Sequence, residues 1–157
     1  QFQSCRVRLV IRILLSLTAI FAFSNASLAR DGEVCKREQL TAYLIVDVLD
    51  RTGPEVVYDK FADISFQKKL SRSTFSGQIH DLHKQLGMSK PDQRKLLGIA
   101  LKNEDGSTGE FCIYRFRNKY GVHTLNEDIV LRNTGAGWML SGMFYNLHNP
   151  HTKDKRN

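Results

Sequence analysis

Five histidines, three cysteines and 16 acidic residues supply the side chains with which this 157-residue chain could do chemistry. His80 and His83 stand three residues apart with Asp81 between them, and imidazole and carboxylate groups are common zinc ligands. The usual two-histidine zinc motif on a helix has a spacing of four residues and a glutamate base, and the sequence offers no identifiable third ligand. We therefore expect His80 and His83 to be solvated or flanking side chains, and we predict no metal and no cofactor.

A nucleophilic active site is not indicated either. The chain has no G-x-S-x-G motif, Cys35 has no obvious base near it, and Cys112 falls in the middle of a predicted strand. A serine or cysteine nucleophile needs an adjacent base or another activating group. We therefore assign no catalytic residue, and an enzymatic role is the less favoured interpretation.

Proton transfer by a buried carboxylate is the enzymatic chemistry that the sequence leaves open. An aspartate or glutamate whose pKa is raised by burial, opposed by a tyrosine hydroxyl, can move a proton next to a carbonyl group. Asp47 is the most interesting carboxylate because it interrupts an apolar run, although it can equally mark the solvent-facing side of a helix. The expected ligand-pocket residues are Tyr43, Asp47, Tyr58, Tyr114 and Trp138, with Asp63 as a further possible lining group.

The chain is basic, with 23 Lys and Arg against 16 Asp and Glu, a formal net charge of +7 and a pI near 9.5. Basic clusters occur at residues 68–72, 94–95 and 115–119, and Tyr114 and Phe116 interleave with the last of them. Arginine and aromatic side chains can stack on single-stranded nucleic acid, but acidic residues are dispersed along the chain. We expect no nucleic-acid partner; a basic face would instead suit an anionic envelope surface or an acidic partner.

Part of the positive charge belongs to an N-terminal leader. Residues 1–29 hold three arginines and no acidic residue, and include the apolar run 13–23 (ILLSLTAIFAF) and an S-L-A site before Arg30. These features are typical of a secretory signal peptide, whereas a spanning helix needs about 20 mostly apolar residues. We predict a signal peptide at 1–29, with a retained N-terminal anchor as the alternative. The expected location is the periplasm or the medium, with no membrane attachment after cleavage; because residue 1 is Gln, the true N-terminus is left open.

Without the leader, 20 basic and 16 acidic residues remain, which gives the mature chain a net charge of +4. Its length suits one domain with one core, and we expect a single domain at residues 30–148 with a polar tail at 149–157. Cys5 leaves with the leader, so Cys35 and Cys112 remain as an even pair in an oxidising compartment. They are a candidate disulfide, with two buried free thiols as the alternative.

Periodicity divides the mature chain into a helical half and a strand half. Helices are predicted at residues 33–51, 54–61 and 71–86. The first helix presents an apolar stripe of Leu40, Leu44 and Val48, widened by Ile45 and Leu49. Ser71 is the expected cap of the third helix, and Gly87 follows its end.

Strands are predicted at residues 94–102, 110–119, 127–133 and 138–147. In the second strand, Phe111, Ile113 and Arg115 point one way and Cys112, Tyr114 and Phe116 the other. Regular alternation in the last strand places Trp138, Leu140, Gly142 and Phe144 on one face. Helices followed by consecutive strands with short connections favour an α+β domain with an antiparallel sheet over βαβ units. We predict a two-layer cone or roll, with about three N-terminal helices packed on a curved antiparallel sheet of about four strands.

The same elements resemble a known family. They are similar to the nuclear-transport-factor-2-like (cystatin-like) cone fold and, within it, to the small exported bacterial proteins filed as domain of unknown function 4019. The likeness covers about residues 39–147. It rests on residues 50–53 (DRTG), Tyr58, Phe61, 66–71 (FQKKLS), 86–87 (LG), Arg94, 110–116 (EFCIYRF), Glu127 and 137–144 (GWMLSGMF). The family's closing pattern is G-x-W-x-x-x-G-aromatic, whereas Gly137 and Trp138 are adjacent here, and Asp128 stands where Thr is expected.

The resemblance implies a cone fold and carries no activity to transfer. We expect a non-catalytic exported binding domain that holds a small apolar ligand in the cone or an envelope or secreted protein on its sheet face. A cone-fold enzyme that uses a buried carboxylate and Tyr for proton transfer or hydrolysis is one alternative. A periplasmic accessory or immunity-type protein is another. The sequence leaves the oligomeric state open, and a dimer is compatible with it.

Overall fold

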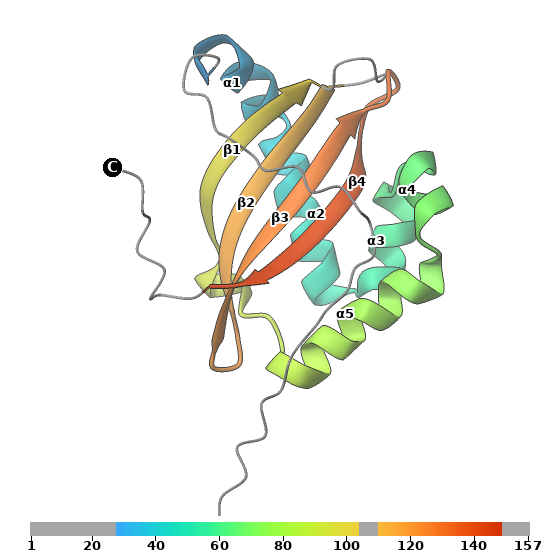
Figure 1. The fold of residues 1–157 in the computed structure, drawn as a ribbon, viewed down its shortest axis with the longest axis vertical. Helices are drawn as coiled ribbons and strands as arrows, with labels where there is room; N and C mark the ends of the chain where they lie inside the picture. The colour runs from blue at the N-terminus through green and yellow to red at the C-terminus, as the bar shows by residue number, and fades with distance from the viewer. Residues whose placement is uncertain (1–27, 104–109, 149–157) are drawn as a thin grey trace, which may run out of the picture.

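The computed structural model describes residues 28–103 and 110–148 (Figure 1). Residues 1–27 of the predicted signal peptide, the loop at 104–109 and the predicted polar tail at 149–157 lie outside the described residues. The described elements are α1 (Leu28–Arg37), α2 (Gln39–Arg51), α3 (Pro54–Phe61), α4 (Ile64–Lys69), α5 (Arg72–Leu86), the 3-10 helix η1 (Pro91–Gln93), β1 (Lys95–Asn103), β2 (Glu110–Tyr120), β3 (His123–Asn133) and β4 (Trp138–Leu147).

The four strands form one antiparallel sheet in the order β1-β2-β3-β4. Figure 1 shows α2 passing behind this sheet, with α3, α4 and α5 beyond β4. The two-layer α+β architecture confirms the predicted fold class, although the described chain has five α-helices rather than about three.

Burial along the central strands shows which face of the sheet the helices cover. On β2, buried residues alternate with half-buried or exposed ones, and Cys112, Tyr114 and Phe116 are fully buried, as their predicted common face requires. β3 buries its matching side chains, which include Leu125, Ile129 and Leu131. The other face of the sheet is not covered by any helix of the described chain.

The first predicted helix is interrupted, and its predicted apolar stripe is wrong at Leu40 and Leu44 but confirmed at Ile45 and Leu49, which are buried. Glu38 leaves the helical conformation (φ −86°, ψ 0°) and separates α1 from α2. Leu40 is 78% and Leu44 is 50% exposed. The residues that α2 buries are Ala42, Ile45, Val46 and Leu49. Because this segment is apolar on most sides, its period alone could not select the side that packs on the sheet.

α4 is a helix that the sequence did not predict. Asp63 caps it, since Oδ1 accepts a hydrogen bond from the Phe66 N–H at 2.6 Å. The Asp63 N–H itself donates to the Leu140 carbonyl of β4 at 2.8 Å, which fastens the α3–α4 junction to the sheet. The other predicted helices are observed as α3 and α5, and α5 has the expected cap, because the Ser71 hydroxyl accepts from the Thr74 N–H.

A bulge at Ser141 changes which side chains of β4 face the helices. The residue is left without a partner on β3, and an extra residue reverses the alternation beyond it. Leu140 and Met143 are both buried and Tyr145 packs against the core, whereas Phe144 is 43% exposed. The prediction that Phe144 shares a face with Leu140 is therefore wrong.

A disulfide joins α1 to the sheet. It links Cys35 to Cys112, the candidate pair of the sequence, across 77 positions of the chain. The Tyr114 hydroxyl adds a hydrogen bond to the Cys35 carbonyl at 2.6 Å. The chain-entropy model assigns a loop of this length about 4.5 kcal/mol of stabilisation, which is a large part of the stability of a small domain.

Two glycines, Gly87 just past α5 and Gly121 in the β2–β3 turn, allow the end of α5 to contact that turn. Gly121 has φ +55°, and a Cβ there would lie 2.5 Å from the Leu86 carbonyl oxygen. Only glycine permits this approach without a shift of the backbone. After this contact the chain runs beside β2. Ser89 forms a backbone bridge with Tyr120, and the Ser89 hydroxyl accepts a hydrogen bond from Arg94.

Candidate functional site

The structure does not gather the predicted pocket residues into one site. Tyr43 packs edge-on against an aromatic ring of β2, and the Tyr58 hydroxyl donates to the backbone carbonyl just past α4 at 2.7 Å. The Tyr114 hydroxyl donates to α1, and Trp138 packs against the apolar core. Each of these four side chains has a separate packing or hydrogen-bonding role in the fold.

Asp47, the fifth predicted pocket residue, faces solvent. Its side chain is 47% exposed and accepts a hydrogen bond from Arg51 Nε at 2.6 Å, one turn further along α2. An exposed ion pair of this kind is worth about 0–1 kcal/mol. The acid–base hypothesis therefore loses the carboxylate on which it was based.

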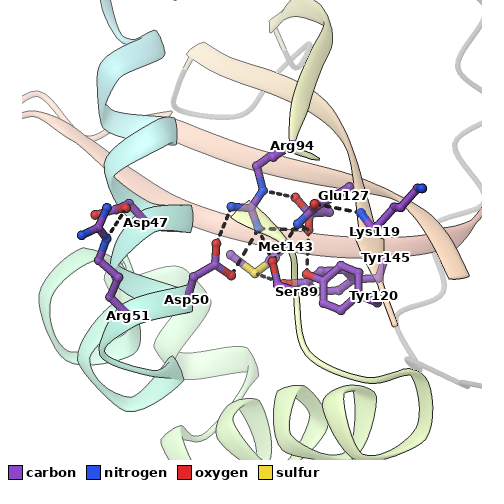
Figure 2. Close-up of polar contacts among 11 residues, drawn as sticks. Asp47, Asp50, Arg51, Ser89, Arg94, Lys119, Tyr120, Glu127, Met143 and Tyr145 are labelled. Atoms are coloured by element: carbon purple, nitrogen blue, oxygen red, sulfur yellow. Dashed lines mark hydrogen bonds and ion pairs between the residues drawn. The ribbon is translucent and has the colours of Figure 1, made fainter. Parts of the chain in front are cut away.

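The interior holds a different polar cluster, centred on Arg94 (Figure 2). The Arg94 side chain is 5% exposed and lies between Asp50 of α2 and Glu127 of β3, which are 3% and 1% exposed. Its guanidinium donates to Asp50 from Nη1 at 2.5 Å and Nη2 at 3.3 Å. It donates to Glu127 from Nε at 2.7 Å and Nη2 at 3.2 Å. These three residues are called the Arg94 cluster.

Neutral polar side chains complete the hydrogen bonds of the Arg94 cluster. Glu127 Oε1 accepts from the Tyr120 hydroxyl at 2.6 Å and from Asn118 Nδ2 at 3.3 Å. The Ser89 hydroxyl accepts from Arg94 Nη2 at 3.1 Å and from Asn118 Nδ2 at 2.7 Å. With both carboxylates ionised the cluster carries one net negative charge, and buried charge is tolerated only where hydrogen bonds disperse it.

Protonation states inside the cluster follow from burial and charge. Burial opposes the positive charge of Arg94, but hydrogen bonds to Asp50 and Glu127 outweigh it and raise the pKa of Arg94 above its ordinary value. Burial, reinforced by negative neighbours, raises the pKa of Tyr120 and of Tyr145. Both phenols therefore stay protonated at neutral pH, and Tyr120 acts as a hydrogen-bond donor.

The Arg94 cluster is built to join the two layers rather than to transfer protons. All four carboxylate oxygens of Asp50 and Glu127 accept hydrogen bonds from within the cluster and its neutral donors. A general base must reach the proton of its substrate directly or through one water. Carboxylates that are 1–3% exposed offer no such approach in this structure.

Sequence reasoning missed this cluster, although a signal exists for Glu127 and for its hydrogen-bond donor Asn118. Glu127 follows the same alternation as Leu125 and Ile129 on the buried face of β3, and Asn118 stands among the buried aromatic residues of β2. A polar residue in the apolar half of an alternation marks a buried group that needs a partner. Asp50 has no such signal, since it lies 44 positions from Arg94 and meets it only through tertiary packing.

The helix-free face of the sheet is the second candidate site. Paired residues of an antiparallel sheet share a face, so the strand register shows which side chains are neighbours there. One row of register partners crosses all four strands and is apolar: Ala100, Ile113, Val130 and Gly142. Phe111 stands in the adjacent row on one side of it, and Phe144 stands in the adjacent row on the other side. Together these residues form the outer apolar patch: Ala100, Ile113, Val130, Gly142, Phe111 and Phe144.

Basic side chains border the outer apolar patch. Arg115 is neutralised by Asp128, which accepts two hydrogen bonds from its guanidinium at 2.7 Å each. Lys95 stands directly opposite Arg117 on the neighbouring strand, and Lys119 follows on the same face. These last three residues, called the basic trio, have no carboxylate partner within the described parts of the chain.

Neither a metal site nor a membrane span is found in the described residues. No group of three or more His, Cys, Asp or Glu side chains there could hold a metal ion, and no helix there is long and apolar enough to cross a membrane. Comparison with known proteins gives no match to a family model, to a curated protein or to a solved structure.

Arg94→Met should lower the free energy of unfolding by about 3–5 kcal/mol, because it leaves two buried carboxylates without their cation. Arg51→Met is the matched control, since its ion pair with Asp47 is exposed, and it should cost less than about 1 kcal/mol. Urea unfolding followed by circular dichroism measures both. Equal, small losses would contradict a central role of the Arg94 cluster.

His83 should make folding sensitive to mild acid. Its ring stacks on Tyr120, and burial lowers the pKa of His83 below its ordinary value. The unfolded chain then takes up the proton first, at about pH 6.5, so stability should fall as the pH drops below that value. Unfolding at a series of pH values checks this, and the slope should shrink in His83→Gln; an unchanged slope would be the contrary result.

Proposed function

We propose that this chain is a non-catalytic binding domain that docks a protein partner on the helix-free face of its sheet. One observation carries the proposal. The interior polar groups of the Arg94 cluster are satisfied by the domain's own side chains, whereas the outer apolar patch lies on a face that no described helix covers. Contiguous apolar side chains on an uncovered face are typical of interaction sites.

A small apolar ligand inside the cone has less support. The side chains that would line such a site are engaged with one another: Tyr43 packs on Phe116, and Tyr58 packs on Phe66 and Phe75. Interiors packed in this way resemble crystals of small molecules rather than open pockets. These contacts favour a binding site on the outside of the domain.

The catalytic alternative would have to rest on Glu127 and Tyr120 instead of Asp47. Their 2.6 Å hydrogen bond and the contact of Glu127 with Arg94 give both groups a structural partner. A conformational opening of the two layers would be needed before a substrate could reach them. We therefore rank catalysis below binding.

Photocross-linking tests the proposed face. A benzoylphenylalanine in place of Ile113, on the outer apolar patch, should form a defined adduct in an extract of the producing cells. The same group in place of Gln85, which is exposed on α5, should not. Ile113→Asp should then weaken binding of the purified partner by about tenfold or more, a loss of about 1.4 kcal/mol, and Gln85→Asp should leave it unchanged.

Circular dichroism of Ile113→Asp must show an intact fold for the comparison to count. Adducts that form equally from both positions, or a partner whose affinity is insensitive to Ile113→Asp, would argue against docking on this face. Affinity is measured by calorimetry with the purified partner.

We also propose that the protein is exported. The composition of residues 1–29 supports this, and the disulfide between Cys35 and Cys112 is compatible with an oxidising compartment. Intact-mass analysis of protein from the producing cells should give a chain that begins at Arg30 and contains no alkylatable thiol. A retained leader or two free thiols would contradict export.

Membership in the domain-of-unknown-function-4019 family is a proposal as well. It is supported by the order of helices before sheet. It is supported further because three positions of the resemblance, Asp50, Arg94 and Glu127, meet in the Arg94 cluster.

A further inference from the structure

We infer that the partner presents an acidic protein surface with protruding apolar side chains, an inference that rests on the docking face proposed above. The charge of that face points to it. The basic trio adds three positive charges at one end of the face, while Asp128, the buried acid of this face among the described residues, is already bound to Arg115.

The placement of the basic trio is unfavourable for folding. Like charges directly opposite each other on antiparallel strands destabilise the pair, and Lys95 stands directly opposite Arg117. Among the described residues, the Arg117 guanidinium donates from Nε to the neutral Asn126 side-chain oxygen at 3.3 Å. A negatively charged partner surface would relieve this repulsion, since complementary potentials steer and select partners.

The apolar part of the face indicates which side chains of a partner can contact it. Small residues dominate its β1 side, because Gly98 and Ala100 stand next to Ile113 and Arg115 in the register. A Cβ on Gly98 would meet nothing within 4 Å, so this part of the face is flat and open. Apolar side chains of a partner can reach it beside the basic trio.

Two other occupants fit less well. A second copy of the chain would bring two basic trios toward one docking face, and like-charge contacts across an interface cost affinity. A lipid surface is favoured by large apolar side chains that protrude from the protein, whereas Phe144 is the one exposed side chain of the outer apolar patch and its Ala100, Phe111, Ile113 and Val130 are half-buried.

Peptide titration of the isotope-labelled full chain, followed by amide chemical shifts, tests the charge of the partner. The probe is a short amphipathic helical peptide with leucine on one face and glutamate on the other. The control peptide has lysine in place of glutamate. The glutamate peptide should shift amides of β2 around Ile113 and Arg117 and bind at least about tenfold more tightly than the lysine peptide, with a difference that shrinks as salt is added.

Arg117→Glu with Lys119→Glu should abolish that preference. Lys68→Glu with Lys69→Glu is the matched control, because it makes the same charge change at exposed positions on α4, and it should retain the preference. Equal binding of both peptides at the β2 face would overturn the acidic partner and leave the docking face standing. If both double variants lost the preference for the glutamate peptide equally, the preference would depend only on the net charge of the protein, and the inference would be overturned too.

Two further measurements test the alternative occupants of the face, a membrane and a second copy of the chain. Sedimentation with phosphatidylcholine–phosphatidylglycerol vesicles that is lost in Arg117→Glu with Lys119→Glu would identify a membrane surface instead. A dimer in analytical ultracentrifugation that Ile113→Asp dissociates would identify a second copy. Either result overturns the inference, and a failure of cross-linking from position 113 would instead remove the docking face itself.

Discussion

The guanidinium of Arg94 is the positive charge on which the contact between the two layers depends. It lies between a carboxylate of α2 and a carboxylate of β3, and each of the three side chains is almost fully buried. Removal of Arg94 alone would leave two unpaired negative charges in a low-dielectric interior, whereas removal of either carboxylate would leave one buried ion pair. The neutral donors Asn118 and Tyr120 of β2 share the excess negative charge, and Ser89, in the connection after α5, accepts hydrogen bonds from Arg94 and Asn118. The position of that connection depends in turn on the close approach of Gly87 and Gly121.

The burial of the Arg94 cluster bears on function because its carboxylates are inaccessible to a substrate from solvent. The carboxylate that seemed suited to catalysis, Asp47, is on the outside of α2 and paired with Arg51. The buried carboxylates Asp50 and Glu127 are bound to Arg94. The proposed binding by the helix-free face needs none of these groups, so the polar interior and the proposed partner site do not compete for the same residues.

Much of the fold followed from local patterns. The ends of α3, α5, β1, β2 and β4 are close to the predicted ranges, because proline, glycine, serine caps and two-residue alternation act through neighbours in the chain. The predicted third strand was too short, since β3 begins at His123 rather than at Glu127. Where prediction failed, the deciding contact was distant. Glu38 interrupts the first helix next to the part of α1 that Cys35 ties to β2, and Ser141 bulges out of a register set by β3.

The sequence by itself determined the fold class, the alternation of β2 that buries Cys112, Tyr114 and Phe116, and the identity of the two cysteines able to pair. These depend on residue type and on spacing within one element. Tertiary structure alone decided that Leu40 and Leu44 face outward, that Phe144 moves to the outer face, and that Asp50 meets Arg94. A helix that is apolar on most sides, a strand with a bulge and two charges 44 positions apart each have several local solutions, and only packing of the layers selects among them.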